Sequence, residues 1–214
     1  METVEHLIAR FVDLWKRMGA VDDARGVCEE LLRAYGEPQR RYHGIDHLRD
    51  CLEQLDTAPA TGHARDLAEA AIWFHDAVYL PGAADNEARS AAWAARALAQ
   101  AGAAEPAAHE VARLVQLTDH TRPAEDPVGA LVCDVDLSIL GRPSGEFAEY
   151  ERRIREEYGR VPDPLYRSGR ASVLTGLLAR DPLYRSDHFR ARYETAARRN
   201  LKRSLEGLSD PAAE

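Results

Sequence analysis

The sequence predicts an all-α protein, and three observations support this prediction. Apolar residues recur at steps of three and four along most of the chain, the pattern of helices with one buried face. Glycine and proline stand where these runs stop, at positions typical of helix ends. Strand-like alternation is nearly absent, and no repeat, low-complexity tract or linker divides the chain. We therefore expect residues 1–214 to form a single compact domain of roughly eight to ten helices.

The apolar pattern places the helices at about 7–18, 27–35, 42–55, 66–77, 87–101, 106–119, 128–140, 145–159, 164–180 and 187–206. The segment 87–101 is rich in alanine, which favours helix by its propensity alone. Asp85 or Asn86 is the expected N-cap of this helix, and Gly102 its expected end. The run LVCDVDLSIL, 131–140, is the best strand candidate, because periodicity alone does not decide so short an apolar run.

Composition and charge exclude several classes of protein. The formal net charge is −8, so duplex nucleic acid is not an expected partner. The three cysteines are scattered without a CxxC pair, which argues against a disulfide framework and against a cysteine zinc site, and suits a reducing cytosol. No stretch approaches the ~20 apolar residues of a membrane helix, and the acidic N-terminal segment is unlike a signal peptide. We expect a cytoplasmic protein with no membrane partner, and the sequence leaves a homo-oligomer open.

Histidines and carboxylates interrupt three apolar helical segments. RYHGIDHLRD contains His43 and His47, which share a helix face because they are four residues apart. AAIWFHDAVY contains the pair His75-Asp76, and DVDLSILG contains Asp136. A buried aspartate costs several kcal/mol unless it is paired or bound to a cation. One metal ion bound by all three segments would explain why each of them carries these polar residues.

The donor set predicts the kind of metal. Neutral imidazoles together with carboxylates form a mixed nitrogen and oxygen set, which suits octahedral divalent ions such as Mn, Fe, Co, Ni or Mg better than thiolate-bound zinc. We expect one such ion, and His43 and His120 are available as ligands for a second.

His47, His75-Asp76 and Asp136 follow one another in the order of the H…HD…D signature, and this resembles the HD-domain metal-dependent phosphohydrolases. A bacterial subfamily of predicted phosphohydrolases is similar over six blocks between about residues 40 and 201: RYHGIDHL, WFHDAVY, DNEARSA, DVDLSILG, Y-x-x-x-I-R-x-E-Y and ARRNL. The resemblance implies an all-helical fold, a metal ion held by these four residues, and hydrolysis of a phosphate ester by attack of a metal-bound water.

For two of the four expected metal ligands, the sequence leaves a second residue open. The resemblance favours His47 as the first ligand, because the ligand in that family is typically followed at once by an amphipathic helix. His43 shares the face of His47 and could be the ligand instead, with His47 behind it. Asp136 fits the closing aspartate of the family better than Asp134 does. The two aspartates lie on roughly opposite helix faces, so a regular helix cannot supply both to one ion.

Further residues are candidates for chemistry around the ion. Glu87 is a candidate for proton transfer and otherwise a simple helix-start residue, and His120 is a candidate for the same task or for contact with phosphate. Asp76 would act both as ligand and in catalysis. For the substrate phosphate we expect Arg41, Arg155 and His43, since arginine's planar fork suits phosphate.

The leading hypothesis is a metal-dependent phosphohydrolase acting on a small phosphate ester, with a nucleotide as the preferred substrate class. One alternative is a helical sensing or interaction module that binds a metal without turnover. A less favoured alternative is a phosphatase of the haloacid dehalogenase type, whose D-x-D motif resembles LVCDVDLSIL but ends a strand.

Overall fold

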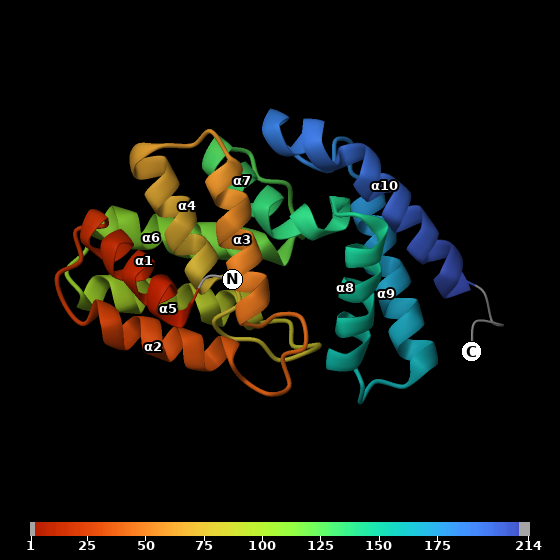
Figure 1. Cartoon of the computed structure of the whole chain (residues 1–214), viewed down its shortest axis with the longest axis horizontal. Coiled ribbons are helices and arrows are strands. Elements are labelled where there is room, and N and C mark those ends of the chain that lie inside the picture. The colour runs from red at the N-terminus through yellow and green to blue at the C-terminus, as the bar shows by residue number, and fades with distance from the viewer. Residues whose placement is uncertain (1–2, 210–214) are drawn as a thin grey trace. The chain divides into compact units, whose positions relative to one another are not determined.

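The computed structural model describes residues 3–209, and every regular element in that range is helical (Figure 1). The α-helices are α1 (Val4–Arg17), α2 (Ala24–Tyr35), α3 (Ile45–Thr57), α4 (Gly62–Phe74), α5 (Asn86–Gln100), α6 (Glu105–Gln116), α7 (Pro127–Asp136), α8 (Ser144–Glu157), α9 (Asp163–Leu178) and α10 (Asp187–Ser209). Two 3-10 helices, η1 (Leu117–Asp119) and η2 (Leu137–Gly141), extend α6 and α7. The all-α prediction is confirmed.

Three predicted helices end earlier than the apolar pattern indicated. The segments 106–119 and 128–140 are each α-helix followed by a 3-10 turn, so the strand candidate 131–140 is helical. The predicted helix 66–77 runs instead over 62–74, which leaves His75 and Asp76 outside the helix. In each case apolar residues continue past the point where the backbone leaves the α-helix, so periodicity overestimates the length.

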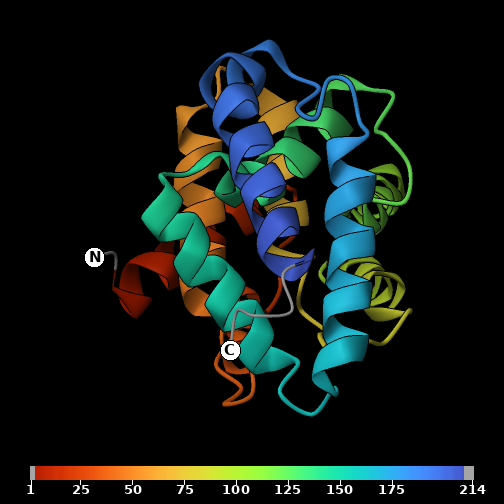
Figure 2. The same cartoon turned by 90° about the vertical axis from the view of Figure 1, so that its right-hand side faces the viewer.

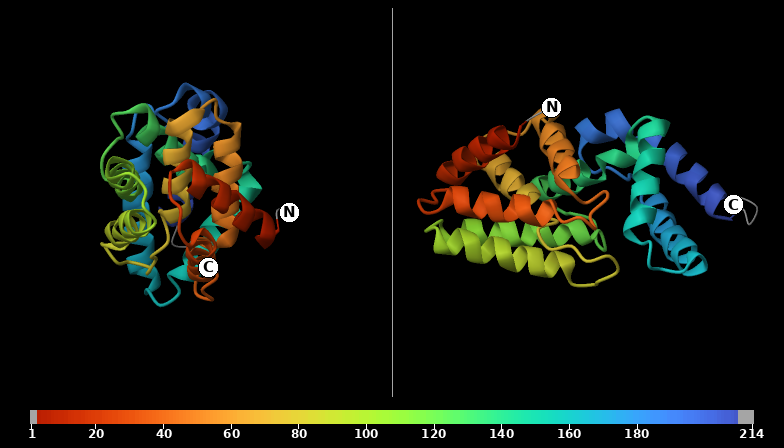
Figure 3. Two further views of the ribbon diagram at one scale, coloured as in Figure 1. Left: turned by 90° about the vertical axis from the view of Figure 1, so that its left-hand side faces the viewer. Right: turned by 60° about the horizontal axis from the view of Figure 1, so that its bottom comes forward.

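The chain divides into two compact units, 1–136 and 137–214, each described here within residues 3–209. In the first unit α4 is the central helix, because it packs against α1, α3, α5, α6 and α7. Its residues from Leu67 to Phe74 are all buried, which matches its nearly continuous apolar sequence. The two panels of Figure 3 show α5 and α6 side by side along this unit. The C-terminal end of α4 therefore delivers His75 and Asp76 into the interior.

The second unit contains η2, α8, α9 and α10, and Figure 2 shows its three α-helices running alongside one another. The Asn200 side chain of α10 donates two hydrogen bonds of 2.9 Å, to the carbonyls of Leu140 and Arg142. Gly141, at the end of η2, lies against Tyr193, and a Cβ on this glycine would come within 2.4 Å of the Tyr193 Cβ. The contact of η2 with α10 therefore requires glycine at position 141.

Gly141→Ala is expected to destabilise the protein by about 1–3 kcal/mol, the usual cost of an atom forced into a packed interior. Gly169→Ala is the matched control, because a Cβ on this helical glycine of α9 meets no atom within 4 Å. The control should gain about 0.5–1 kcal/mol from helix propensity. Urea unfolding of both variants measures the difference, and equal stabilities would contradict the close approach of Gly141 to Tyr193.

The three cysteines, Cys28, Cys51 and Cys133, are buried, and they form no disulfide bond within the described residues. Among the described residues, every helix is too short or too polar to traverse a lipid bilayer.

Candidate metal centre

Four predicted ligands come from three separate places in the first unit and meet in its interior. His47 lies in the first turn of α3, His75 and Asp76 follow directly after α4, and Asp136 is the last residue of α7. His47, His75 and Asp76 are buried, and the Asp136 side chain is 17% exposed. Packing of α3 and α7 against α4 brings these chain ends together.

The side-chain atoms of these residues converge on one small volume. The Nε2 atoms of His47 and His75 are 3.1 Å apart. Asp136 Oδ1 lies 3.2 Å from His47 Nε2 and 3.6 Å from His75 Nε2. Asp76 Oδ2 lies 3.1 Å from His75 Nε2 and 3.6 Å from His47 Nε2. Each carboxylate therefore has one oxygen within 3.6 Å of both imidazole Nε2 atoms.

These separations fit the donor atoms of a metal ion. Donors bound at about 2.1 Å are about 3.0 Å apart at a right angle and about 3.4 Å apart at the tetrahedral angle. The five separations, from 3.1 to 3.6 Å, lie within about 0.2 Å of this range. A buried group that includes His47, Cys51, His75 and Asp136 could thus hold a metal ion.

A backbone carbonyl on the Nδ1 side of the ring fixes the orientation of His75. Its Nδ1 lies 2.8 Å from the carbonyl oxygen of Ile72, one turn earlier in α4, so a proton on Nδ1 is donated to that oxygen. Nε2, on the other side of the ring, faces Asp76 and Asp136 and binds a metal ion only in its deprotonated form. This backbone contact is the usual way in which a metal-binding histidine is oriented.

The carboxylates make the centre attract positive charge. Burial lowers the pKa of His75, but Asp76 and Asp136 outweigh burial and raise that pKa to about 9. Burial also acts to raise the pKa of Asp76, yet the neighbouring His75 and His43 lower it below its ordinary range. The pKa of Asp136 is lowered in the same way, chiefly by His120 and His47, against its burial. A cation, whether protons on imidazole or a metal ion, is needed to balance the two buried charges.

Cys51 is the member of the group that sequence reasoning missed. Its Sγ lies 3.6 Å from Nε2 and 3.7 Å from Nδ1 of His47, one helical turn away on α3. The spacing of four residues from His47 was the available signal. Because Sγ is almost equally distant from both ring nitrogens, it faces the imidazole ring rather than the lone pair of Nε2.

The structure separates the alternative ligands. His43 is half-buried and its ring stacks on Tyr79 with the ring centroids 4.2 Å apart, whereas His47 supplies the converging nitrogen. Asp134 is buried and has its own partners, but it is not in the group that Asp136 joins. The geometry thus favours His47 and Asp136.

Glu87 lies near the centre at the start of α5. Burial raises the pKa of its carboxyl, and the negative charges of Asp76 and Asp119 act in the same direction. The expected capping differs in detail: Asp85 occupies the N-cap position without a side-chain hydrogen bond to the helix. The Asn86 side chain instead bonds both the N–H and the carbonyl of Leu80, at 3.0 Å each, and fixes the preceding loop.

His120 follows η1 and contacts a predicted ligand. Its Nε2 lies 2.7 Å from Oδ2 of Asp136, the oxygen that is not turned toward the other histidines. Burial lowers the pKa of His120, while the bonds to Asp136 and Cys133 raise it to about 10. Its backbone has a φ of 53°, an uncommon value for a residue with a side chain. His120 is thus positioned to hold the Asp136 carboxylate.

The predicted arginines are not in the group. Arg41 is exposed on the segment before α3. Arg155 belongs to the second unit, where its guanidinium bonds the carbonyls of Tyr158 and Val161 and lies 4.5 Å from the centroid of the Tyr166 ring. Their role in substrate binding stays a prediction.

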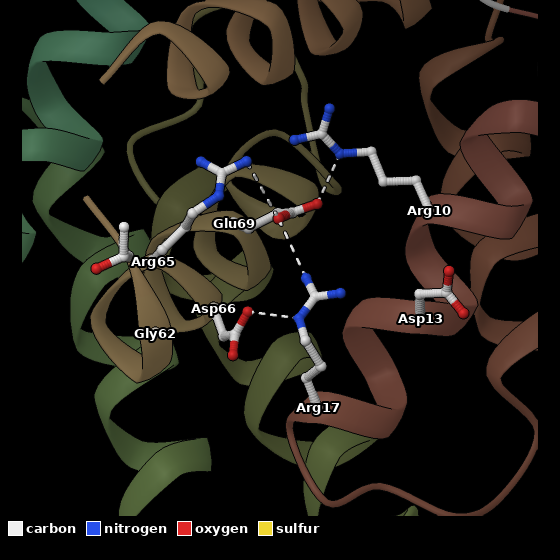
Figure 4. A pocket seen from close by; sticks show the side chains of 8 residues that line it. Arg10, Asp13, Arg17, Gly62, Arg65, Asp66 and Glu69 are labelled. Carbon is white, nitrogen blue, oxygen red and sulfur yellow. Dashed lines mark hydrogen bonds and ion pairs between the residues drawn. The ribbon is translucent and has the colours of Figure 1, made fainter. Parts of the chain in front are cut away.

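A polar hollow elsewhere in the first unit has matched charges (Figure 4). The buried carboxylate of Glu69 contacts Arg10 at 2.6 Å and Arg17 at 3.4 Å. Arg10 also bonds Asp56 twice at 2.9 Å, so its donors are engaged. This network ties α1 to α3 and α4 and has a structural role.

Comparison with protein-family models, curated proteins and solved structures finds no match to this chain. The chemistry of the site therefore follows from its own residues.

Proposed function

We propose that this protein is a metal-dependent phosphohydrolase that acts on a small phosphate ester, with a nucleotide as the first substrate class to test. The observation that supports it is the convergence of two imidazole nitrogens and two carboxylate oxygens within 3.1–3.6 Å in a buried site. The order of the residues, resembling HD-domain phosphohydrolases, supports the same reaction class.

The donor set fits a divalent ion held by His47, His75, Asp76 and Asp136. Two carboxylates balance its charge, and neutral imidazoles complete a mixed set that suits Mn, Fe, Co, Ni or Mg. Such an ion polarises a phosphoryl oxygen and makes water a better nucleophile at neutral pH, which phosphate ester hydrolysis requires.

The surrounding residues supply proton transfer and orientation. Burial raises the pKa of the Glu87 carboxyl, and the charges of Asp76 and His120 act on it. A carboxyl group so placed is proposed to transfer a proton to a leaving oxygen. His120 keeps Asp136 turned toward the other ligands through its 2.7 Å contact. His43 and the exposed Arg41, next to the centre in sequence, are proposed to bind the substrate phosphate.

The test is phosphate release from a panel of nucleotides and sugar phosphates, measured with chelator-treated protein after addition of each divalent ion. We expect release only with added metal, and none from Asp76→Ala, which loses an anionic donor. Metal bound without release from any substrate would favour a module that binds without turnover. Release that is equal in Asp76→Ala would contradict the proposed site.

A further inference from the structure

Arg40 is a buried arginine that connects two of the three segments bearing the predicted ligands. Its side chain is 1% exposed, although it carries a full positive charge. Its Nη1 donates to the carbonyl of Asp76 at 2.5 Å, and its Nη2 donates to the carbonyl of Ala77 at 3.1 Å. These carbonyls follow the end of α4, where a helix no longer satisfies them. The cation also faces the negative end of the α4 dipole.

The same guanidinium holds the segment before α3. Nη1 also reaches the carbonyl of His43 at 3.3 Å, and Nε donates to Glu37 at 2.9 Å. The Cζ atom of the guanidinium lies 5.5 Å from the ring centroid of Tyr35 and 5.7 Å from that of Tyr79. Arg40 thus fixes the turn that carries Asp76 to the segment that leads into His47.

Tyr35 supports Asp76 from the opposite side of its backbone. The Asp76 N–H donates to the Tyr35 hydroxyl at 3.3 Å, and that hydroxyl donates to the Trp73 carbonyl at 3.4 Å. The hydroxyl also lies 3.5 Å from His75 Nδ1. The Asp76 residue is therefore held at its N–H by Tyr35 and at its carbonyl by Arg40.

We propose that Arg40 is a positioning residue that sets the separation between the His75-Asp76 pair and His47, with Tyr35 as its partner. This inference rests on the proposed metal site. Neither side chain donates to the converging atoms, so both act through the backbone that carries them. Lysine cannot replace Arg40, because one ammonium group cannot reach several carbonyls in the fixed fork of a guanidinium.

The experiment measures Co²⁺ affinity and the visible Co²⁺ spectrum of the full-length chain, together with the Tm of the metal-free protein. For Arg40→Lys and Arg40→Met we expect the Kd for Co²⁺ to rise about 10–100-fold, the effect of losing a group that orients metal ligands. Tyr35→Phe keeps the ring and should raise the Kd in the same direction. The Co²⁺ spectra of these variants should differ from the wild-type spectrum.

Arg10→Met is the matched control, because Arg10 is also a largely buried arginine of the first unit but bonds Glu69 (Figure 4) and Asp56. It should lower the Tm and leave the Kd for Co²⁺ unchanged. Wild-type Kd in both Arg40→Lys and Tyr35→Phe would overturn the positioning role. An equal rise in Arg10→Met would overturn it also, since general loosening would then explain the effect. A wild-type protein that binds no Co²⁺ would instead overturn the metal site itself.

Discussion

Asp136→Asn is expected to lose bound metal and all metal-dependent phosphate release, whereas Asp134→Asn is expected to keep both. The two aspartates lie two residues apart on α7 and differ in direction. Asp136 Oδ1 is 3.2 Å from His47 Nε2, while Asp134 lies outside the group. Asparagine keeps the size of the side chain and removes its charge, so the comparison isolates the anionic donor.

The expected effect is large. Groups that only orient metal ligands change affinity about 10–100-fold, and a donor atom should exceed this. Elemental analysis and the Kd for Mn²⁺ or Co²⁺ should be measured on monodisperse wild-type protein and on both variants. Because Asp134 is buried and has partners, its variant should be less stable but should keep its metal, and the Tm separates the two effects. Metal loss in Asp134→Asn alone would show that the ligand assignment is wrong.

The sequence predicted the helices well. Each helix buries one face, and this places apolar residues at steps of three and four within the segment itself. Polar residues inside apolar helices indicated a shared metal site, and the resemblance to HD-domain phosphohydrolases implied His47, His75, Asp76 and Asp136 as its ligands. Their meeting could not be derived from spacing, because it depends on how α3 and α7 pack on α4.

Arg40 marks the limit of the sequence argument. It stands beside Arg41, and no local pattern indicates that Arg40 is buried while Arg41 is exposed. Arg40 is buried because it bonds the carbonyls of Asp76 and Ala77, which lie 36 and 37 residues further along the chain. The ends of helices also depend on contacts between residues far apart in the sequence. Helix α4 stops at Phe74 although Ala77 is apolar and buried, because the backbone turns there and places Asp76 at the candidate metal centre.

Glu87→Gln is expected to lower turnover by roughly 10²–10⁴ while metal content stays near that of the wild type. The reason is that glutamine keeps the size and the hydrogen-bonding carbonyl of the side chain but holds no transferable proton. Glu87 is not among the converging donors, so its replacement should leave the ion in place. Loss of metal in this variant would mean that Glu87 is itself a ligand.

Stability effects must be separated from this loss of rate. Glu87 lies in the first turn of α5, where a negative charge favours the helix by about 0.3–1 kcal/mol. Glu105 occupies the first turn of α6 and is exposed, so Glu105→Gln reports the same helix effect away from the site. Both variants should shift the Tm slightly, and only Glu87→Gln should lose turnover. Full activity in Glu87→Gln would show that this residue only starts the helix. His120→Gln would then be the next variant to compare by metal content, Tm and turnover, because His120 contacts Asp136 directly.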